Sequence, residues 1–140
     1  TDLLAETKVA PELSNEAHYY RAKAYLDAGK VEGAMDDLKI LAKDTRNIYG
    51  AEAKYKVAQI YFDAGQTGQA EKEVLDYIEV STPHTYWLAR SFVLLSDVYM
   101  KLGRNLDAKQ YLLSLKQNYQ ADDDIAGMIE SRLNKLNAEN

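Results

Sequence analysis

Three stretches of the chain share one spacing of a tyrosine, a glycine and an alanine: YLDAGKVEGA at 25–34, YFDAGQTGQA at 61–70 and YMKLGRNLDA at 99–108. Each reads Tyr-x3-Gly-x4-Ala, with free variation between these positions. On both sides of every copy, apolar residues recur three or four positions apart, as in a helix with one buried face. Glycine after such a pattern favours the left-handed conformation that ends a helix. The signature therefore predicts two helices joined by a tight turn, three times over.

The glycines are 36 and 38 residues apart. A period in this range, with two helices per unit, is typical of a helical solenoid. No strand-like alternation competes with it. We expect helices over 12–28, 31–43, 47–64, 67–80, 83–102 and 105–119. Thr67, Thr82 and Asn105 are the expected N-caps, with Pro83 in a first turn. The acidic triplet Asp122–Asp124 suits the start of a final helix.

A single domain over residues 1–140 follows from this pattern. We expect the three repeats to cover residues 11–46, 47–82 and 83–120. Before them, residues 1–10 would be the remnant of an upstream repeat helix, and after them, residues 121–140 would be a capping helix with one apolar stripe. Buried small residues would let the two helices of a unit touch: Ala22 with Ala34, Ala58 with Ala70, and Ser96 with Ala108. The tyrosines of the signature would fill the space between units.

The repeats resemble the tetratricopeptide repeat (TPR) family, whose pattern has small residues at helix crossings and a tyrosine in the first helix. The resemblance covers about residues 12–119 and implies a right-handed superhelix of antiparallel helix hairpins. His18, Lys54 and Phe92 stand where the family has a tryptophan, which is a departure from its pattern. The longer period is similar to the TPR-like repeats of bacterial cell-envelope proteins. That likeness points to the bacterial envelope or periplasm, with the cytoplasm left open.

Composition limits the classes of function. The chain has 140 residues, a formal net charge of −5 at pH 7 and no cysteine. A negative chain lacks the basic face that follows a phosphate backbone, so no nucleic-acid partner is expected. The longest apolar runs are only a few residues, so no membrane span is expected in this segment. Without cysteine there is no disulfide and no thiolate metal site.

No catalytic constellation is visible. His18 and His84 have no partner at metal-ligand spacing, and both are interpreted as surface or helix-end residues. Phosphate-binding and nucleophile-elbow strings are absent. The triplet Asp122–Asp124 lacks the later ligands of a calcium loop and is interpreted as a helix cap. The sequence predicts a protein that is not an enzyme and that needs no cofactor and no metal.

The resemblance implies a concave face lined by the first helix of each unit. The residues at the matching positions form the expected partner-binding set: Tyr19, Lys23, Leu26, Tyr55, Gln59, Phe62, Val93, Asp97 and Met100. Apolar ladders flanked by isolated charges suit a peptide with aromatic or aliphatic anchors. The alternative is that these side chains pack against neighbouring helices. The family's carboxylate clamp is not matched, since only Lys23 is compatible with it.

We therefore expect a non-catalytic scaffold or adaptor segment of a larger protein that binds a protein or peptide partner on the concave face. Two other functions stay open. One is self-association into a homo-oligomer through an apolar face at the N-terminal edge, and the other is a small-ligand binder or an enzyme accessory domain.

Overall fold

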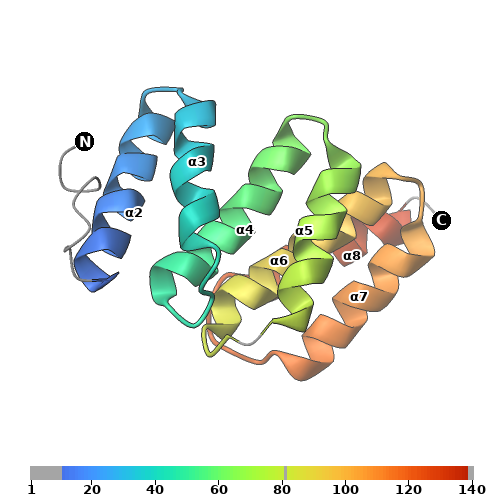
Figure 1. Ribbon diagram of the computed structural model, residues 1–140. Helices are drawn as coiled ribbons and strands as arrows, with labels where there is room; N and C mark the ends of the chain where they lie inside the picture. Colours follow the sequence, from blue (N-terminus) through green and yellow to red (C-terminus); the bar gives the residue numbers. More distant parts are fainter. Residues whose placement is uncertain (1–10, 81, 139–140) are drawn as a thin grey trace.

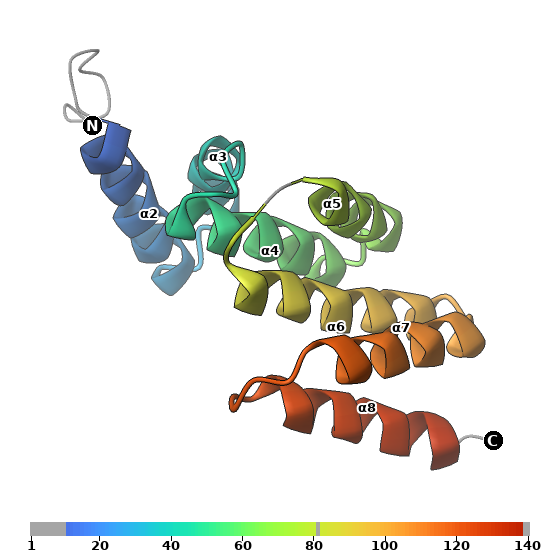
Figure 2. The same ribbon diagram turned by 90° about the horizontal axis from the view of Figure 1, so that it is seen from below.

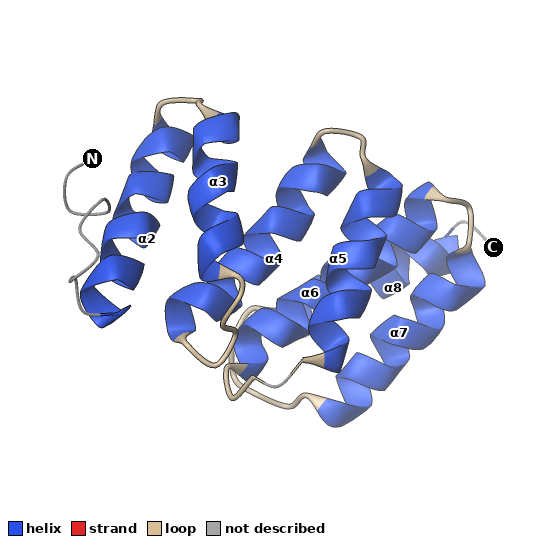
Figure 3. Cartoon of the chain, viewed as in Figure 1, coloured by secondary structure: helices blue, strands red, loops and turns tan. Residues whose placement is uncertain are grey.

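The computed structural model describes residues 11–80 and 82–138, and within this part there are seven helices and no strand (Figure 3). The helices are α2 (Pro11–Asp27), α3 (Val31–Leu41), α4 (Ile48–Asp63), α5 (Thr67–Glu79), α6 (Thr85–Lys101), α7 (Asn105–Asn118) and α8 (Ile125–Ala138). The predicted all-helical class is confirmed. The expected remnant helix of residues 1–10 lies outside the described residues.

Helices that follow one another across short turns fold back as pairs: α2 on α3, α4 on α5, and α6 on α7 (Figure 1). Next, α2, α4, α6 and α8 contact one another in that order, whereas in the described part of the chain the backbones of α3, α5 and α7 do not approach each other closely. Figure 2 shows the resulting row, which bends with α3 and α5 on its outer side. One surface is therefore built mainly from α2, α4, α6 and α8, and it includes residues of α3 where the junction of α2 and α4 is open. We call it the inner face.

The same two backbone hydrogen bonds close each of the three turns. In the first turn, the Gly29 N–H donates to the Leu26 carbonyl and the Lys30 N–H donates to the Tyr25 carbonyl. This pair recurs at Gly65 and Gly103. It requires a positive φ after the helix, and the three glycines have φ values of 75°, 79° and 77°. The prediction of left-handed glycines is confirmed, and tyrosine is the residue whose carbonyl accepts the second bond.

Small residues are buried on both helices of each pair. The fully buried members are Ala22, Ala34, Ala58, Ala70, Ser96 and Ala108. Around them, the hydrophobic core has two parts. One cluster, centred on Leu38 and Val57, joins α2, α3 and α4. A larger cluster, which includes Leu95 and Leu112, joins α4 to α8.

Three of the expected N-caps are wrong. Thr67 and Asn105 are the first residues of α5 and α7, and no side chain caps either helix. The residue before each is engaged in the glycine turn, so no extended residue remains to act as a cap. The α6 helix begins at Thr85, beyond Pro83. Thr82 instead donates its hydroxyl to the Thr45 carbonyl at 2.7 Å and accepts the His84 N–H at 3.1 Å.

The acidic triplet does precede a helix, as expected. Asp123 accepts the Ile125 N–H at 2.9 Å, so its carboxylate satisfies a free donor at the start of α8. Asp124 accepts the Tyr86 hydroxyl at 2.8 Å and so ties this end of α8 to α6.

Candidate functional site

The nine predicted partner-binding residues lie on α2, α4 and α6, and the structure gives them three different environments. The first is the ladder Tyr19, Tyr55 and Val93, which packs along the row. Tyr19 turns toward α4, where its ring is 4.6 Å from that of Tyr49 and its hydroxyl donates to Glu52 at 3.2 Å. Burial and the Glu52 carboxylate raise the pKa of Tyr19 to about 12.

The next two members of this ladder repeat the pattern one helix further along. The Tyr55 ring lies 5.6 Å from Trp87 of α6, and Arg90 donates to the Tyr55 hydroxyl at 3.3 Å. Val93 is 3% exposed and lies in the cluster that includes α8. These three side chains join each helix of the row to the next, which leaves little of Tyr55 or Val93 for a partner.

The second environment is polar. Asp97 accepts two hydrogen bonds from Arg132 of α8, at 2.7 and 2.9 Å. Gln59 accepts the Tyr55 hydroxyl and donates to Asp63, each at 2.8 Å. Lys23 is exposed, with its amine 5.4 Å above the Tyr19 ring. Asp97 is therefore paired, whereas Lys23 keeps its charge at the surface.

The third environment is the ladder Leu26, Phe62 and Met100, one position after each signature tyrosine. All three side chains are half-buried and line two pockets. The α2–α4 pocket, of about 620 Å³, is lined by Leu26, Val31, Glu32, Met35, Ile60, Asp63, Ala64 and Gln66. The α4–α6 pocket, of about 330 Å³, is lined by Phe62, Asp97, Met100, Lys101 and Lys135. These three are the apolar residues of the predicted set that line pockets.

The two pockets are related by the repeat. Leu26 and Asp63 in the first correspond to Phe62 and Lys101 in the second. Behind them the pockets differ, because Ile60 lines the first whereas Val98, its counterpart, is fully buried.

A polar link crosses the second junction and has no counterpart at the first. Burial raises the pKa of Tyr99, and a hydrogen bond with Glu71 of α5 raises it further. Arg104 lies 3.8 Å from the same carboxylate and 4.3 Å from the centre of the Tyr99 ring. Met35 and Gln66 stand at the positions that correspond to Glu71 and Arg104, and they cannot form this ion pair. The α2–α4 pocket therefore stays open as far as α3.

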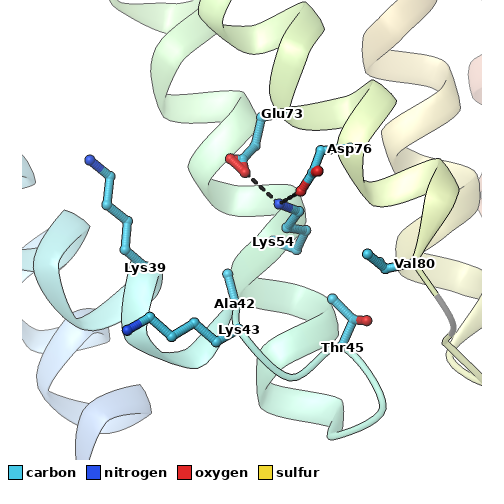
Figure 4. Close-up of a pocket in the computed structure, with 8 residues that line it drawn as sticks. All are labelled: Lys39, Ala42, Lys43, Thr45, Lys54, Glu73, Asp76 and Val80. Carbon is cyan, nitrogen blue, oxygen red and sulfur yellow. Dashed lines mark hydrogen bonds and ion pairs between the residues drawn. The ribbon is translucent and has the colours of Figure 1, made fainter.

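A smaller pocket of about 280 Å³ lies between α3, α4 and α5 (Figure 4). At its centre the Lys54 amine donates to Glu73 and Asp76, both at 2.6 Å. Burial alone would lower the pKa of Lys54, but the two carboxylates outweigh it and raise the pKa. Lys39 and Lys43 extend away from this ion pair in Figure 4. The buried Lys54 is thus held by a half-buried and an exposed carboxylate of α5, so this ion pair joins α4 to α5.

His18 is not a surface residue, which corrects the interpretation made from the sequence. Its side chain is 12% exposed, and its Nδ1 lies 2.7 Å from Asp37 of α3. Lys54 with Glu73, and Phe92 with Tyr111, occupy the same two repeat positions as His18 with Asp37. The same position in each repeat, held by His18, Lys54 and Phe92, is thus used to join the helices of a pair. His84 does lie at a helix start, with Nε2 3.0 Å from the Arg46 carbonyl.

No family model matches the chain, and searches of curated proteins and of solved structures gave no match. Among the described residues, no group of three or more His, Cys, Asp or Glu side chains could hold a metal ion. None of the described helices combines the length and the apolar composition that a bilayer crossing requires.

Proposed function

We propose that this chain is a TPR-like solenoid, a right-handed superhelix of three antiparallel hairpins capped by α8, and that it is a non-catalytic scaffold binding a peptide segment of a partner protein on the inner face. Three turns with the same two hydrogen bonds, three buried alanines and a continuous row of α2, α4, α6 and α8 support the repeat architecture. Neighbouring repeats of this kind bury each other's faces and leave an extended surface for a partner.

The observation that carries the proposal is the placement of Leu26, Phe62 and Met100. They occupy one repeat position, pack against the core on one side and line pockets on the other, whereas Tyr55 and Val93 of the parallel ladder are buried and Tyr19 contacts α4. An apolar side chain seated in such a pocket contributes roughly 1.5–3 kcal/mol. Two anchors would contribute about 3–6 kcal/mol before the cost of association is subtracted, so hydrogen bonds and charges along the peptide have to supply the rest of a weak, reversible complex.

A random library of displayed dodecapeptides, selected on the folded protein, tests the proposal. Selected peptides should lose binding to the double variant Leu26→Ala, Phe62→Ala. Binding should persist to Leu106→Ala, which changes an exposed leucine on α7, away from the inner face. Circular dichroism confirms that each variant is folded. The proposal would be wrong if the library gave no binder. It would also be wrong if the selected peptides bound the double variant as tightly as the wild-type protein.

A further inference from the structure

The two pockets carry charges of opposite sign at their rims. Glu32 and Asp63 line the α2–α4 pocket, whereas Lys101 and Lys135 line the α4–α6 pocket. Asp97, also in the second pocket, is neutralised by its two hydrogen bonds from Arg132. The inner face is therefore negative at one pocket and positive at the next.

These rim charges are available for a ligand. Within the described part of the chain, Glu32, Lys101 and Lys135 form no hydrogen bond or ion pair through their side chains, and Asp63 receives only the neutral amide of Gln59. Asp63 and Lys101 also occupy the same repeat position, two residues before the glycine. At this repeat position the charge is therefore negative in the second repeat and positive in the third.

Resting on the proposed function, we infer that the inner face binds an extended peptide with two apolar anchors three residues apart and with opposite charges at its two ends. A lysine or arginine would lie beside the anchor in the α2–α4 pocket, and an aspartate or glutamate beside the anchor in the α4–α6 pocket.

The spacing follows from the fold. The pockets lie on either side of α4, and packed helices lie about 8–10 Å apart. A polyproline II segment rises about 3.1 Å per residue and turns once in three residues, so side chains three apart point the same way at about 9 Å. That conformation places both anchors in their pockets at once.

The charges would select among peptides that share the same anchors. A peptide with two cations brings one of them to Lys101 and Lys135, and a peptide with two anions brings one of them to Glu32 and Asp63. Like charges brought together disfavour the wrong partner, whichever way the peptide runs. The mixed peptide alone meets a complementary charge at both pockets.

Fluorescence anisotropy with four labelled probes tests this inference. The probes are Lys-Leu-Pro-Pro-Leu-Glu, the doubly basic Lys-Leu-Pro-Pro-Leu-Lys, the doubly acidic Glu-Leu-Pro-Pro-Leu-Glu and the neutral Gln-Leu-Pro-Pro-Leu-Gln. We expect the mixed probe to bind about tenfold more tightly than either single-sign probe at low salt, because it replaces one like-charge contact by an exposed ion pair. The difference should shrink as salt is added.

Charge reversal in the protein should move the preference. In the double variant Lys101→Glu, Lys135→Glu, the doubly basic probe should bind most tightly. In the double variant Glu32→Lys, Asp63→Lys, the doubly acidic probe should bind most tightly. The control pair Lys72→Glu and Glu79→Lys on α5 should leave the ranking unchanged. Equal affinity for all four probes, a ranking that these variants do not move, or the absence of binding overturns the inference. The library selection on Leu26 and Phe62 judges the proposed function separately.

Discussion

Asp37 is a fully buried carboxylate that three hydrogen bonds from two side chains hold in place. Arg21 donates through Nε at 2.8 Å and through a terminal nitrogen at 2.6 Å, and His18 Nδ1 lies at 2.7 Å. Burial alone would raise the pKa of Asp37, but the hydrogen bonds and charges of Arg21 and His18 outweigh it and lower the pKa. The native state therefore favours the ionised form more than the unfolded chain does.

This carboxylate should make stability depend on pH in the acid range. Because its folded pKa is lowered, its contribution is fully present above the ordinary carboxyl pKa of about 3.9 and is lost as pH falls below that value. At pH 6, Asp37→Asn should lower the free energy of unfolding by about 2 kcal/mol, and the difference from wild type should shrink below pH 4. Urea denaturation across pH 3–6 measures both. Asp36→Asn, at the exposed neighbour, is the control and should change little; a difference for Asp37→Asn that stays constant with pH would contradict this role.

Ala70 tests the requirement for a small residue where the helices of a pair meet. Its side chain is 0% exposed, so leucine would bring three extra carbons into filled space. We expect Ala70→Leu to destabilise the protein by about 1–3 kcal/mol through overpacking. Thermal and urea unfolding measure the change. Gln69→Leu, one residue earlier on the exposed side of α5, should change stability little, and an equal effect of the two substitutions would show that Ala70 is not at the crossing.

At the scale of the helices, the sequence did not predict one close contact, between the backbone after α3 and the start of α4. A Cβ built on Gly50, near the start of α4, would lie 1.9 Å from the Asp44 carbonyl oxygen and 2.6 Å from that of Leu41. The start of α4 thus lies directly on the backbone that follows α3. A glycine inside a helical pattern can indicate such an approach, but Gly50 lies outside the repeated signature and received no role.

Gly50→Ala should therefore be among the most damaging small substitutions in the chain. Because the clash is with backbone, relief requires α3 and α4 to separate, and we expect a loss of about 3 kcal/mol or more. Gly68→Ala is the matched control: Gly68 is also near a helix start, and its added Cβ meets nothing within 4 Å. That change should be neutral or slightly stabilising. Chemical denaturation compares them, and similar stabilities would contradict the close approach.

The helix boundaries were predictable because they depend on local sequence. The contacts between helices were less predictable because they depend on how two helices pack. Apolar spacing and the glycines placed six helices within about two residues of their observed ends, because a left-handed glycine acts on its own turn. The caps at Thr67 and Asn105 were wrong because the turn itself occupies the cap position. The pairing of His18 with Asp37 depends on how α2 rotates against α3, which residue types do not determine. The pockets beside Leu26 and Phe62 depend in the same way on the angle between pairs.

For the whole molecule, the contacts predict that stability is not uniform. α2 contacts only α3 and α4 among the described helices, and α3 and α4 enclose the open α2–α4 pocket. The cluster that holds α2 and α3 is the smaller one, whereas α6, α7 and α8 share the larger. In a stack of neighbouring units, such an end opens before the rest.

Native-state hydrogen exchange should therefore show α2 and α3 opening at a lower free energy than α6 and α7. Leu38→Ala, in the first cluster, should speed exchange in α2 and α3 and leave α6–α8 nearly unchanged. Leu112→Ala, its counterpart in the larger cluster, should speed exchange across α4–α8, because those helices share one core. Uniform acceleration by both variants would indicate a single cooperative unit and contradict this division.

The central claim is that the inner face receives a peptide at the pockets beside Leu26, Phe62 and Met100. Titration of ¹⁵N-labelled protein with a library-selected peptide, followed by amide chemical shifts, tests it most directly. We predict that the largest shift changes fall on residues around these three and Ile60, and that they vanish in the double variant Leu26→Ala, Phe62→Ala. Shift changes confined to the outer surfaces of α3, α5 and α7 would contradict the claim.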